Sequence, residues 1–440
     1  NDYGIDAHAY CSIVPGVPDE WFAPYHFNIF RSEQGNEWAS VCKAYHEFTH
    51  ADLAGKPSVI WFRNRKGRGY LVYDYKSHGK PHNMNSEPYW QLRNEFAQRH
   101  GVTFEGANQP APKDADALKA QWSQHVNAAM SALRNNEEVC AWVANRLVEL
   151  GNAVPEDLPT FRLQKSIPAT VTNARTPFED PRLTDFENYP ADLWAKPGEM
   201  KANRAALAKW GAWVNSWSKQ TWGRPVFLVC SADLAESTNI SGFADDYSKD
   251  LSNFGKYDRA NNPTGTLLPQ GITEFANAGL VCGIAAANVS PKPFEYFDGF
   301  YGACSTYGSF SYLKYGLMRL FSQTVQDSEI KLGKVLWIAG HSGPETAEDS
   351  RTHFGIFATG VTQLFPEGHV IDLHPAEYNE VPVALAAALK TNVPIIALHL
   401  TRPNVLIRDR AAEGLGHYHG AAKGAYILRD YKPGLPKMGT

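Results

Sequence analysis

The stretch GITEFANAGLVCGIAAAN, residues 271–288, is the best guide to the fold of this 440-residue chain. It begins with a short polar turn carrying one carboxylate, Glu274, and continues as a nearly uncharged run of small and apolar residues. A helix of this composition is apolar on most faces, so we expect it to be buried. An acid in its first turn interacts favourably with the helix dipole, although an unpaired buried charge is costly. Alone, the stretch predicts a buried helix with a structural acid at its start.

Strand and helix patterns alternate around this stretch. Apolar runs predict strands at residues 226–229, 335–339, 370–373 and 395–400. Helical spacing predicts helices at residues 202–216, 271–288, 310–323 and 381–389. This alternation indicates an α/β fold with a parallel sheet covered by helices on both faces. Ligands of such sheets bind beyond the carboxyl ends of the strands, where we find polar loops at residues 231–234, 341–343 and 401–404.

The first 200 residues have a different organisation. Residues 57–63, PSVIWFR, predict a buried strand, and the basic, glycine-containing loop at residues 64–69 suits a phosphate. Residues 115–150 show a helical apolar stripe, which we interpret as core packing. The proline-rich residues 154–197 predict an extended connector. We therefore expect three parts: residues 1–105, a helical insert and linker at 106–200, and a second α/β domain at 201–440.

Composition narrows the class of protein. Hydrophobic residues make up 43% of the chain, charged residues 20%, and the formal net charge is −4, so a folded protein without affinity for nucleic acid is expected. No apolar run approaches the ~20 residues of a membrane span. The first residues have no basic and apolar signal pattern, and the six cysteines include no CxxC pair. We expect reduced thiols and a cytoplasmic location.

Several segments, in this order and spacing, resemble the transketolase family. They are NDYGID (1–6), KPSVIWFRNRKGRG (56–69), SHGKP (77–81), CSADL (230–234), GITEFANAG (271–279), HSGPETAEDSRTH (341–353) and LTRPN (400–404). The family has GSADL, GIREH, HDSIGxGEDGPTH and LSRQN in the later positions, an HGAP-like turn in the earlier one, and a GDG motif before the first. The resemblance implies the thiamine-diphosphate-binding fold: the end of a diphosphate-binding domain at 1–105 and a pyrimidine-binding domain at 201–440. It covers neither the GDG half of the first domain nor a C-terminal domain.

The same resemblance implies thiamine diphosphate as cofactor. Glu274 is then hydrogen bonded to the pyrimidine N1′, where it favours the imino form that removes the thiazolium C2 proton. Tyr307 and Phe310 match the aromatic shelf under the pyrimidine. The other cofactor-contacting positions are Asp233, His78 and Ile5. Asn1 and the carbonyl of Tyr3 match the ligands of a divalent ion, Mg²⁺ or Ca²⁺.

The substrate channel of the family also has counterparts here. His78 and His353 match proton-transferring histidines, and Asp349 matches an acceptor for a substrate hydroxyl. The positions that match a phosphate-binding set are His341, Arg402, Ser237 and Arg204. For Arg204 and Ser237, a solvated helix arginine and a turn serine are equally good interpretations.

Departures from the family pattern leave alternatives open. Cys230 replaces a glycine, Ser342 replaces an acid, and Ser350-Arg351 replaces Gly-Pro. Arg351 therefore favours a different anionic substrate. We expect transfer of a two-carbon ketol unit between phosphorylated sugars or related compounds. The alternatives are another thiamine-diphosphate reaction, on a 2-oxo acid or a different aldehyde, and a partial subunit. The resemblance implies a homodimer or larger assembly, possibly with a chain that carries the missing half.

Overall fold

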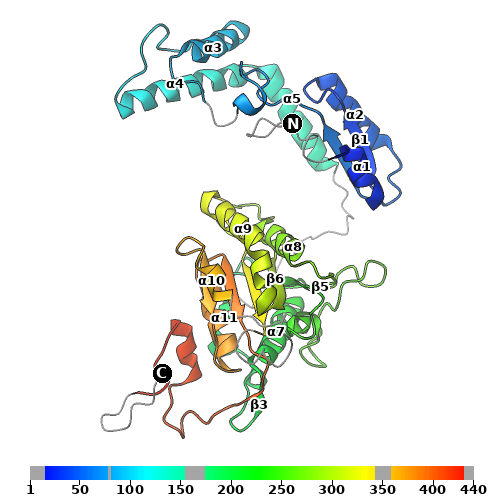
Figure 1. The fold of residues 1–440 in the computed structure, drawn as a ribbon, viewed down its shortest axis with the longest axis vertical. Helices are drawn as coiled ribbons and strands as arrows, with labels where there is room; N and C mark the ends of the chain where they lie inside the picture. The colour runs from blue at the N-terminus through cyan, green and yellow to red at the C-terminus, as the bar shows by residue number, and fades with distance from the viewer. Residues whose placement is uncertain (1–14, 78–80, 154–173, 342–357, 431–440) are drawn as a thin grey trace. The chain divides into compact units, whose positions relative to one another are not determined.

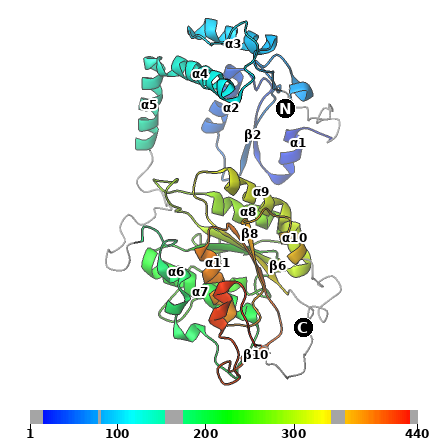
Figure 2. The same cartoon turned by 90° about the vertical axis from the view of Figure 1, so that its left-hand side faces the viewer.

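A computed structural model describes residues 15–77, 81–153, 174–341 and 358–430. The chain divides into two compact units, Asn1–Leu158 and Pro159–Thr440, which are coloured blue to cyan and green to red in Figures 1 and 2. Each unit has its own strands and helices, and each is described by itself below. The three-part division at residues 105 and 200 stays a prediction.

The second unit contains a six-stranded parallel sheet with the order β5-β4-β6-β7-β9-β8. Its strands are β4 (Phe227–Ser231), β5 (Leu267–Leu268), β6 (Tyr301–Tyr307), β7 (Val335–Gly340), β8 (Val370–Leu373) and β9 (Ile395–His399). A short antiparallel pair, β3 (Met200–Lys201) and β10 (Val405–Leu406), lies outside this sheet. The predicted α/β fold with a parallel sheet is confirmed, and the strands predicted near 226, 335, 370 and 395 are present.

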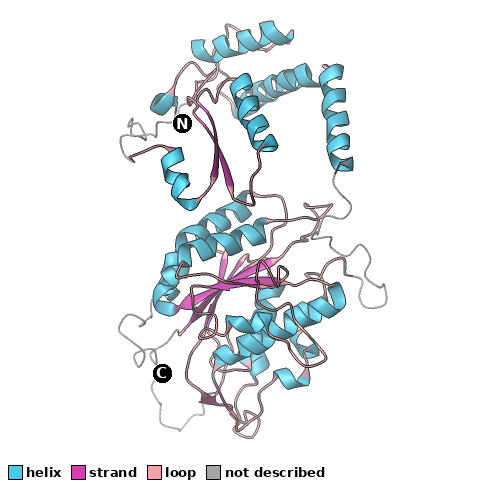
Figure 3. Ribbon diagram, turned by 90° about the vertical axis from the view of Figure 1, so that its right-hand side faces the viewer, coloured by secondary structure: helices cyan, strands magenta, loops and turns pink. Residues whose placement is uncertain are grey.

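Helices cover both faces of this sheet, as Figure 3 shows. The helices are α6 (Pro181–Thr184), α7 (Asn203–Trp222), α8 (Glu274–Ala286), α9 (Tyr315–Asp327), α10 (Ala358–Thr362) and α11 (Glu380–Lys390). One core joins α7 and α11 to the sheet through Trp210, Phe227 and Leu385. The other joins α8 and α9 to the opposite face through Val281, Cys304 and Met318. The buried helix predicted at residues 271–288 is therefore α8.

Strand β6 has no hydrophobic run, which explains why the sequence did not predict it. Its residues, YGACSTY, are small or polar apart from the terminal tyrosines, yet all seven are buried. A side chain at Gly302 would lie 2.5 Å from the carbonyl oxygen of Val281 in α8. Glycine here lets helix and strand approach closely, so small residues mark tight packing rather than a loop.

Residues 174–197 correct the expectation of an extended connector up to residue 197. They form α6 and two 3₁₀ turns, and Leu183, Tyr189 and Leu193 pack into the core around α7. Asp180 caps α6 by accepting a hydrogen bond from the backbone of Arg182. Prolines interrupt regular structure here, but burial of the apolar side chains between them stabilises the segment on the domain.

The first unit has a small parallel sheet of β1 (Asn28–Ser32) and β2 (Ser58–Phe62). Its helices are α1 (Pro18–Phe22), α2 (Trp38–His50), α3 (Glu87–His100), α4 (Ala115–Arg134) and α5 (Glu137–Asn152). The helices predicted within residues 115–150 are therefore present, but their interpretation as core packing is wrong for the largest side chains. Trp122 is 60% exposed and Trp142 65%. Helical periodicity identified an apolar face, but it could not show whether another element covers that face.

Candidate functional site at the carboxyl edge of the sheet

Glu274 is the first residue of α8 and only 7% exposed. The hydroxyl of Thr306 donates a hydrogen bond of 2.9 Å to its Oε1 atom. Within the described ranges, Thr306 is the only hydrogen-bond partner of this carboxylate. Because a buried carboxylate is costly unless its oxygens are paired, a donor on a bound molecule would complete the shell of Glu274.

The end of β6 connects this acid to a second group of side chains. Successive residues of a strand point to opposite faces. Thr306 contacts Glu274 on the α8 face, whereas the hydroxyl of the next residue, Tyr307, donates to Ser237 Oγ at 3.2 Å on the α7 face. Glu274 and Tyr307 are thus linked through consecutive residues of β6, with Tyr307 on the face opposite to the acid.

We call the second group the cationic cluster, comprising Arg204, Ser237, Tyr307, His341 and Arg402. The Arg204 guanidinium donates to the Ser237 carbonyl and to Nε2 of His341 (2.7 Å). The rings of Tyr307 and His341 stack with centroids 4.0 Å apart. The structure therefore brings together Arg204, Ser237 and His341 of the family's phosphate-binding set, and the fourth member, Arg402, is near enough to Arg204 to affect its charge.

Asn203 holds the two arginines of the cluster near each other. Its side chain donates to the carbonyl of Pro375 after β8 (2.9 Å) and accepts from the amide of Thr401 after β9 (2.7 Å). The start of α7, which carries Arg204, is thereby fixed against the strand end that carries Arg402. Through this buried amide, Arg204 is held near the strand end, unlike a helix arginine that is free in solvent.

The electrostatics of the cluster favour an anion. Burial lowers the pKa of Arg204, and the positive charge of Arg402 lowers it further, against an opposing effect of Tyr307. Within the described part of the chain, no carboxylate forms an ion pair with Arg204. The two guanidinium groups repel each other, so a bound anion would relieve the repulsion.

Two strand ends at this edge have unusual backbone conformations. His341 after β7 and Asp233 after β4 have φ values of 57° and 58°, in the left-handed region that non-glycine residues rarely adopt. His341 is nevertheless 1% exposed, and its ring is fixed against Tyr307. Such strain persists only where packing overdetermines it, and it is concentrated at binding sites.

The remaining predicted residues are not part of these two groups in the described structure. Asp233 is exposed. Phe310 is half-buried in the 3₁₀ segment Gly308–Lys314, which Lys314 ties to β6 through a hydrogen bond to the Cys304 carbonyl (3.0 Å). The other predicted positions lie outside the described residues; they are Asn1, Tyr3, Ile5, His78, Asp349, Arg351 and His353.

A chain of buried hydroxyl groups below the site was not predicted. Ser305 Oγ donates to Ser231 Oγ (2.8 Å) and is 2.7 Å from Thr238 Oγ1. These residues hold the ends of β4 and β6 together. Serine and threonine within strands of a buried parallel sheet are the only signal that could have indicated them, and that signal is weak. Thr306 was missed for the same reason.

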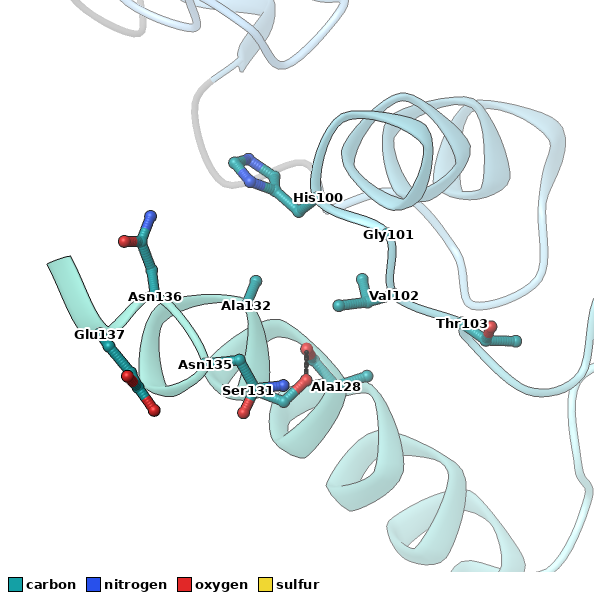
Figure 4. Close-up of a pocket in the computed structure, with 10 residues that line it drawn as sticks. All are labelled: His100, Gly101, Val102, Thr103, Ala128, Ser131, Ala132, Asn135, Asn136 and Glu137. Carbon is teal, nitrogen blue, oxygen red and sulfur yellow. Dashed lines mark hydrogen bonds between the residues drawn. The ribbon is translucent and has the colours of Figure 1, made fainter. Parts of the chain in front are cut away.

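A groove in the first unit lacks comparable chemistry. It lies between the end of α3 and the turn joining α4 to α5, has a volume of about 550 Å³, and is shown in Figure 4. Its lining includes His100 and Ser131, whose hydroxyl donates a hydrogen bond to the carbonyl of Ala128 (2.8 Å). The titratable residues of this lining are His100 and Glu137. These two alone do not form a catalytic set.

The cysteines and the membrane expectation can also be compared with the structure. Cys230, Cys282 and Cys304 are buried free thiols, whereas Cys42 and Cys140 are exposed. Burial raises the pKa of the Cys304 thiol above its ordinary value. Among the helices of the described residues, none has the length and apolar character needed to cross a membrane.

Comparisons with known proteins agree with this architecture. Residues 223–406 match the family described as "Transketolase, pyrimidine binding domain". The transketolase of Staphylococcus aureus (strain MW2) is 32% identical over 412 residues, which are 92% of this chain and 51% of that protein. Transketolase 1 of Pasteurella multocida is 28% identical over 243 residues, 55% of this chain and 32% of that protein. The matched part of the chain thus spans about half the length of these curated relatives, or less.

Solved structures show the same fold. A Pichia stipitis transketolase in complex with sedoheptulose-7-phosphate has a TM-score of 0.56 and 18% sequence identity, covering 98% of this chain and 54% of the other. The transketolase of Campylobacter jejuni has a TM-score of 0.54 at 17% identity, covering 92% and 51%. From the matching family model and these relatives, we conclude that the chain belongs to the transketolase family, whose pyrimidine-binding domain matches residues 223–406.

Proposed function

We propose that the chain takes part in a thiamine-diphosphate-dependent transfer of a two-carbon ketol unit between phosphorylated sugars or related compounds. The observation that carries this proposal is the buried carboxylate of Glu274, which begins the helix that the family motif identifies and, among the described residues, is hydrogen bonded to Thr306 alone. The related transketolases support the class of reaction, and the cationic cluster supports an anionic substrate.

The residues at Glu274 fit the pyrimidine end of the cofactor. A carboxylate with an available oxygen is the acceptor that a protonated ring nitrogen requires, and the apolar surroundings in α8 exclude water from it. When bound, thiamine diphosphate supplies a carbon nucleophile for the carbonyl of the donor substrate. Glu274 would orient the ring and hold a proton at its nitrogen, with Thr306 fixing the carboxylate.

The cationic cluster would bind and orient the substrate. Arg204 and Arg402 would hold a phosphate group, with Ser237 and His341 fixing the guanidinium of Arg204. Asn1 and Tyr3 are proposed to bind the metal ion, and His78, Asp349 and His353 to act on substrate hydroxyl groups. Tyr307, Phe310, Asp233 and Ile5 remain proposed cofactor contacts, and Arg351 a proposed substrate contact. A homodimer, or an assembly with another chain, and a cytoplasmic location are further proposals.

Replacing Glu274 with glutamine tests this function. The substitution preserves shape but removes the acceptor charge, so ketol transfer should fall by at least about 10²-fold. Glu295→Gln, on an exposed acid that pairs with Lys292, is the matched control and should retain activity. Turnover by Glu274→Gln at the rate of the unchanged protein would overturn the proposal. Calorimetry with thiamine diphosphate and Mg²⁺ separates the partial-subunit alternative, because tight binding by this chain alone contradicts it.

A panel of donors and acceptors tests the substrate class. We expect ketol transfer from a sugar phosphate, and Arg204→Ala should raise the KM of the phosphorylated substrate more than it lowers kcat. Activity confined to a 2-oxo acid, with no transfer from sugar phosphates, would favour the other thiamine-diphosphate reaction.

A further inference from the structure

One carboxylate and two imidazoles meet at the carboxyl ends of β8 and β9, the last two strands in the order of the sheet. Asp372 lies within β8, His374 follows this strand, and His399 is the last residue of β9. The parallel register pairs Leu373 with Leu398, so the two strand ends lie side by side. One ligand atom from each of the three side chains lies within 4.8 Å of the others.

The three side chains converge on the carboxylate. His399 Nε2 is 2.6 Å from Asp372 Oδ1, and His374 Nε2 is 3.6 Å from Asp372 Oδ2. The two imidazole rings are stacked, with centroids 4.1 Å apart and planes inclined by only 8°. Both rings therefore present a nitrogen atom to the same carboxylate.

A further hydroxyl group orients this carboxylate. Thr362, the last residue of α10, donates to Asp372 Oδ2 at 2.6 Å. Hydrogen bonds of this kind position metal-binding side chains and increase metal affinity. The set thus has an outer partner in addition to its three potential ligands.

Burial differs among the three side chains in a way that suits a metal site with access to solvent. His399 is 5% exposed and held in the core, whereas the side chains of Asp372 and His374 are 28% and 49% exposed. His399 would provide a fixed ligand, while His374 has space to adjust. Two ligand atoms on a tetrahedral Zn²⁺ lie about 3.3 Å apart, given bonds of roughly 2.0–2.1 Å, so small side-chain rotations are sufficient.

A purely structural histidine–carboxylate pair would need only one of the two rings. Across the described ranges, no lysine or arginine forms an ion pair with Asp372. Two neutral imidazoles and one carboxylate carry a net charge of −1, which a divalent cation complements. Two histidines and one carboxylate are the ligand set of several open zinc and non-haem iron sites.

We propose that Asp372, His374 and His399 bind a divalent transition-metal ion, with Zn²⁺ as the probe of choice. The site is independent of the proposed cofactor function and of the oxygen-liganded ion that accompanies the cofactor in the family. Mg²⁺ prefers oxygen ligands and keeps its water, so it does not compete well for two imidazoles. Water or an anion would occupy the remaining coordination positions.

The experiment measures Zn²⁺ binding by the full 440-residue chain without thiamine diphosphate and with Mg²⁺ in excess. Cys42 and Cys140 are exposed thiols and are replaced by serine in every variant, because thiolates also bind Zn²⁺. Titration against a chelator of known affinity should give one Zn²⁺ per chain. His374→Ala should weaken this binding by at least about tenfold, the lower limit for losing even an outer partner.

The matched control removes a histidine from another stacked pair. His46 and His50 on α2 have ring centroids 3.9 Å apart, so His46→Ala removes one imidazole without changing Asp372, His374 or His399. His46→Ala should leave Zn²⁺ affinity unchanged. Replacement by Co²⁺ adds a spectroscopic test: visible absorption bands should be present in the parent chain and His46→Ala, but lost in His374→Ala.

The outcomes separate a metal site from a structural cluster. Equal Zn²⁺ affinity in the parent chain and His374→Ala, or equal loss in both histidine variants, would overturn the proposal. His374 is half-exposed, so its variant should melt near the temperature of the parent chain. If it does not fold, Asp372→Asn tests the same site by removing the ligand charge while preserving shape. Its Zn²⁺ affinity should also fall at least tenfold, and an unchanged affinity rejects the site.

Discussion

Among the described residues, Thr306 alone donates a hydrogen bond to the buried carboxylate of Glu274. The hydroxyl of Thr306 is 2.9 Å from Oε1, and both residues are buried between α8 and β6. A buried charge that loses its donor costs more than the net value of the hydrogen bond, because water cannot replace that donor. Removing the Thr306 hydroxyl should therefore cost more stability than the loss of one ordinary hydrogen bond.

Thr306→Val should lower the free energy of unfolding by about 1–3 kcal/mol, since it preserves shape and removes the donor. Urea denaturation checks this value. Thr306→Ser keeps the hydroxyl and is the control, with a smaller loss due to the missing methyl group. Equal stability of Thr306→Val and the parent protein would show that solvent reaches the carboxylate.

At the same scale, the sequence identified residues but not their neighbours. The LTRPN segment and the helix start at Asn203 lie about 200 residues apart, yet the Asn203 side chain accepts a hydrogen bond from the amide of Thr401. This contact brings Arg204 near Arg402. The resemblance named both arginines. Their proximity depends on the order of strands in the sheet, which residue types alone do not specify.

At the scale of elements, α4 and α5 carry an apolar stripe that no described element covers well. Trp122, Trp142 and Leu147 are each at least 60% exposed, in contrast to Trp210 of α7, which is fully buried. Burial removes apolar area from water and is the main stabilising effect of such side chains. Tryptophans with the same helical spacing thus contribute very differently to stability.

Trp122→Gln and Trp142→Gln should each change the free energy of unfolding by less than about 1 kcal/mol, as expected for surface substitutions. Trp210→Ala should cost about 3–5 kcal/mol. Guanidinium denaturation followed by circular dichroism compares the three variants. A loss above 2 kcal/mol for either glutamine variant would show that another surface covers the stripe.

Strand β7 begins next to a buried amine whose charge depends on pH. Burial lowers the pKa of Lys334 to about 8, although its Nζ donates to the carbonyls of Thr391 (2.6 Å) and Val393 (2.8 Å). The unfolded chain, with a lysine pKa near 10.5, binds more protons than the folded chain between these values. Stability from this residue therefore rises as pH increases from about 8 to 10.5, and it is lost again as pH falls from 10.5 to about 8.

Lys334→Met should abolish this contribution. Relative to the variant, the parent protein should gain up to roughly 3 kcal/mol between pH 8 and 10.5, a value that follows from the size of the pKa change. Taking the difference between the two proteins cancels the titration of tyrosines and thiols. Urea denaturation at several pH values measures it, and parallel curves for the two proteins would contradict the prediction.

On the scale of the whole molecule, each unit has its own buried polar or apolar centre. In the first unit, His125 is 3% exposed and contacts the Tyr89 hydroxyl (2.9 Å) and the Glu105 carbonyl (2.7 Å). In the second, Trp210 lies in the large core on the α7 face. Units with separate cores unfold as separate cooperative transitions.

Differential scanning calorimetry of the full chain should therefore show two transitions. His125→Ala should lower the temperature of one transition by several degrees, and Trp210→Ala should lower that of the other, each leaving the second within about 1 °C. A single transition, or a shift of both by either variant, would show that the units unfold together.

The sequence by itself determined the α/β class, the parallel sheet, helix α8 and the family, because hydrophobic periodicity and the order of motifs are properties of the linear chain. It predicted β4, β7, β8 and β9 but missed the short β5 and also β6, whose small residues have no apolar pattern. Only the tertiary structure decided that residues 174–197 pack into the core and that Trp122 is exposed. It also decided that Glu274 contacts Thr306 and that Asp372 and His374 meet His399. These contacts join residues that are far apart in the chain, and strand order and register, not composition, bring such residues together.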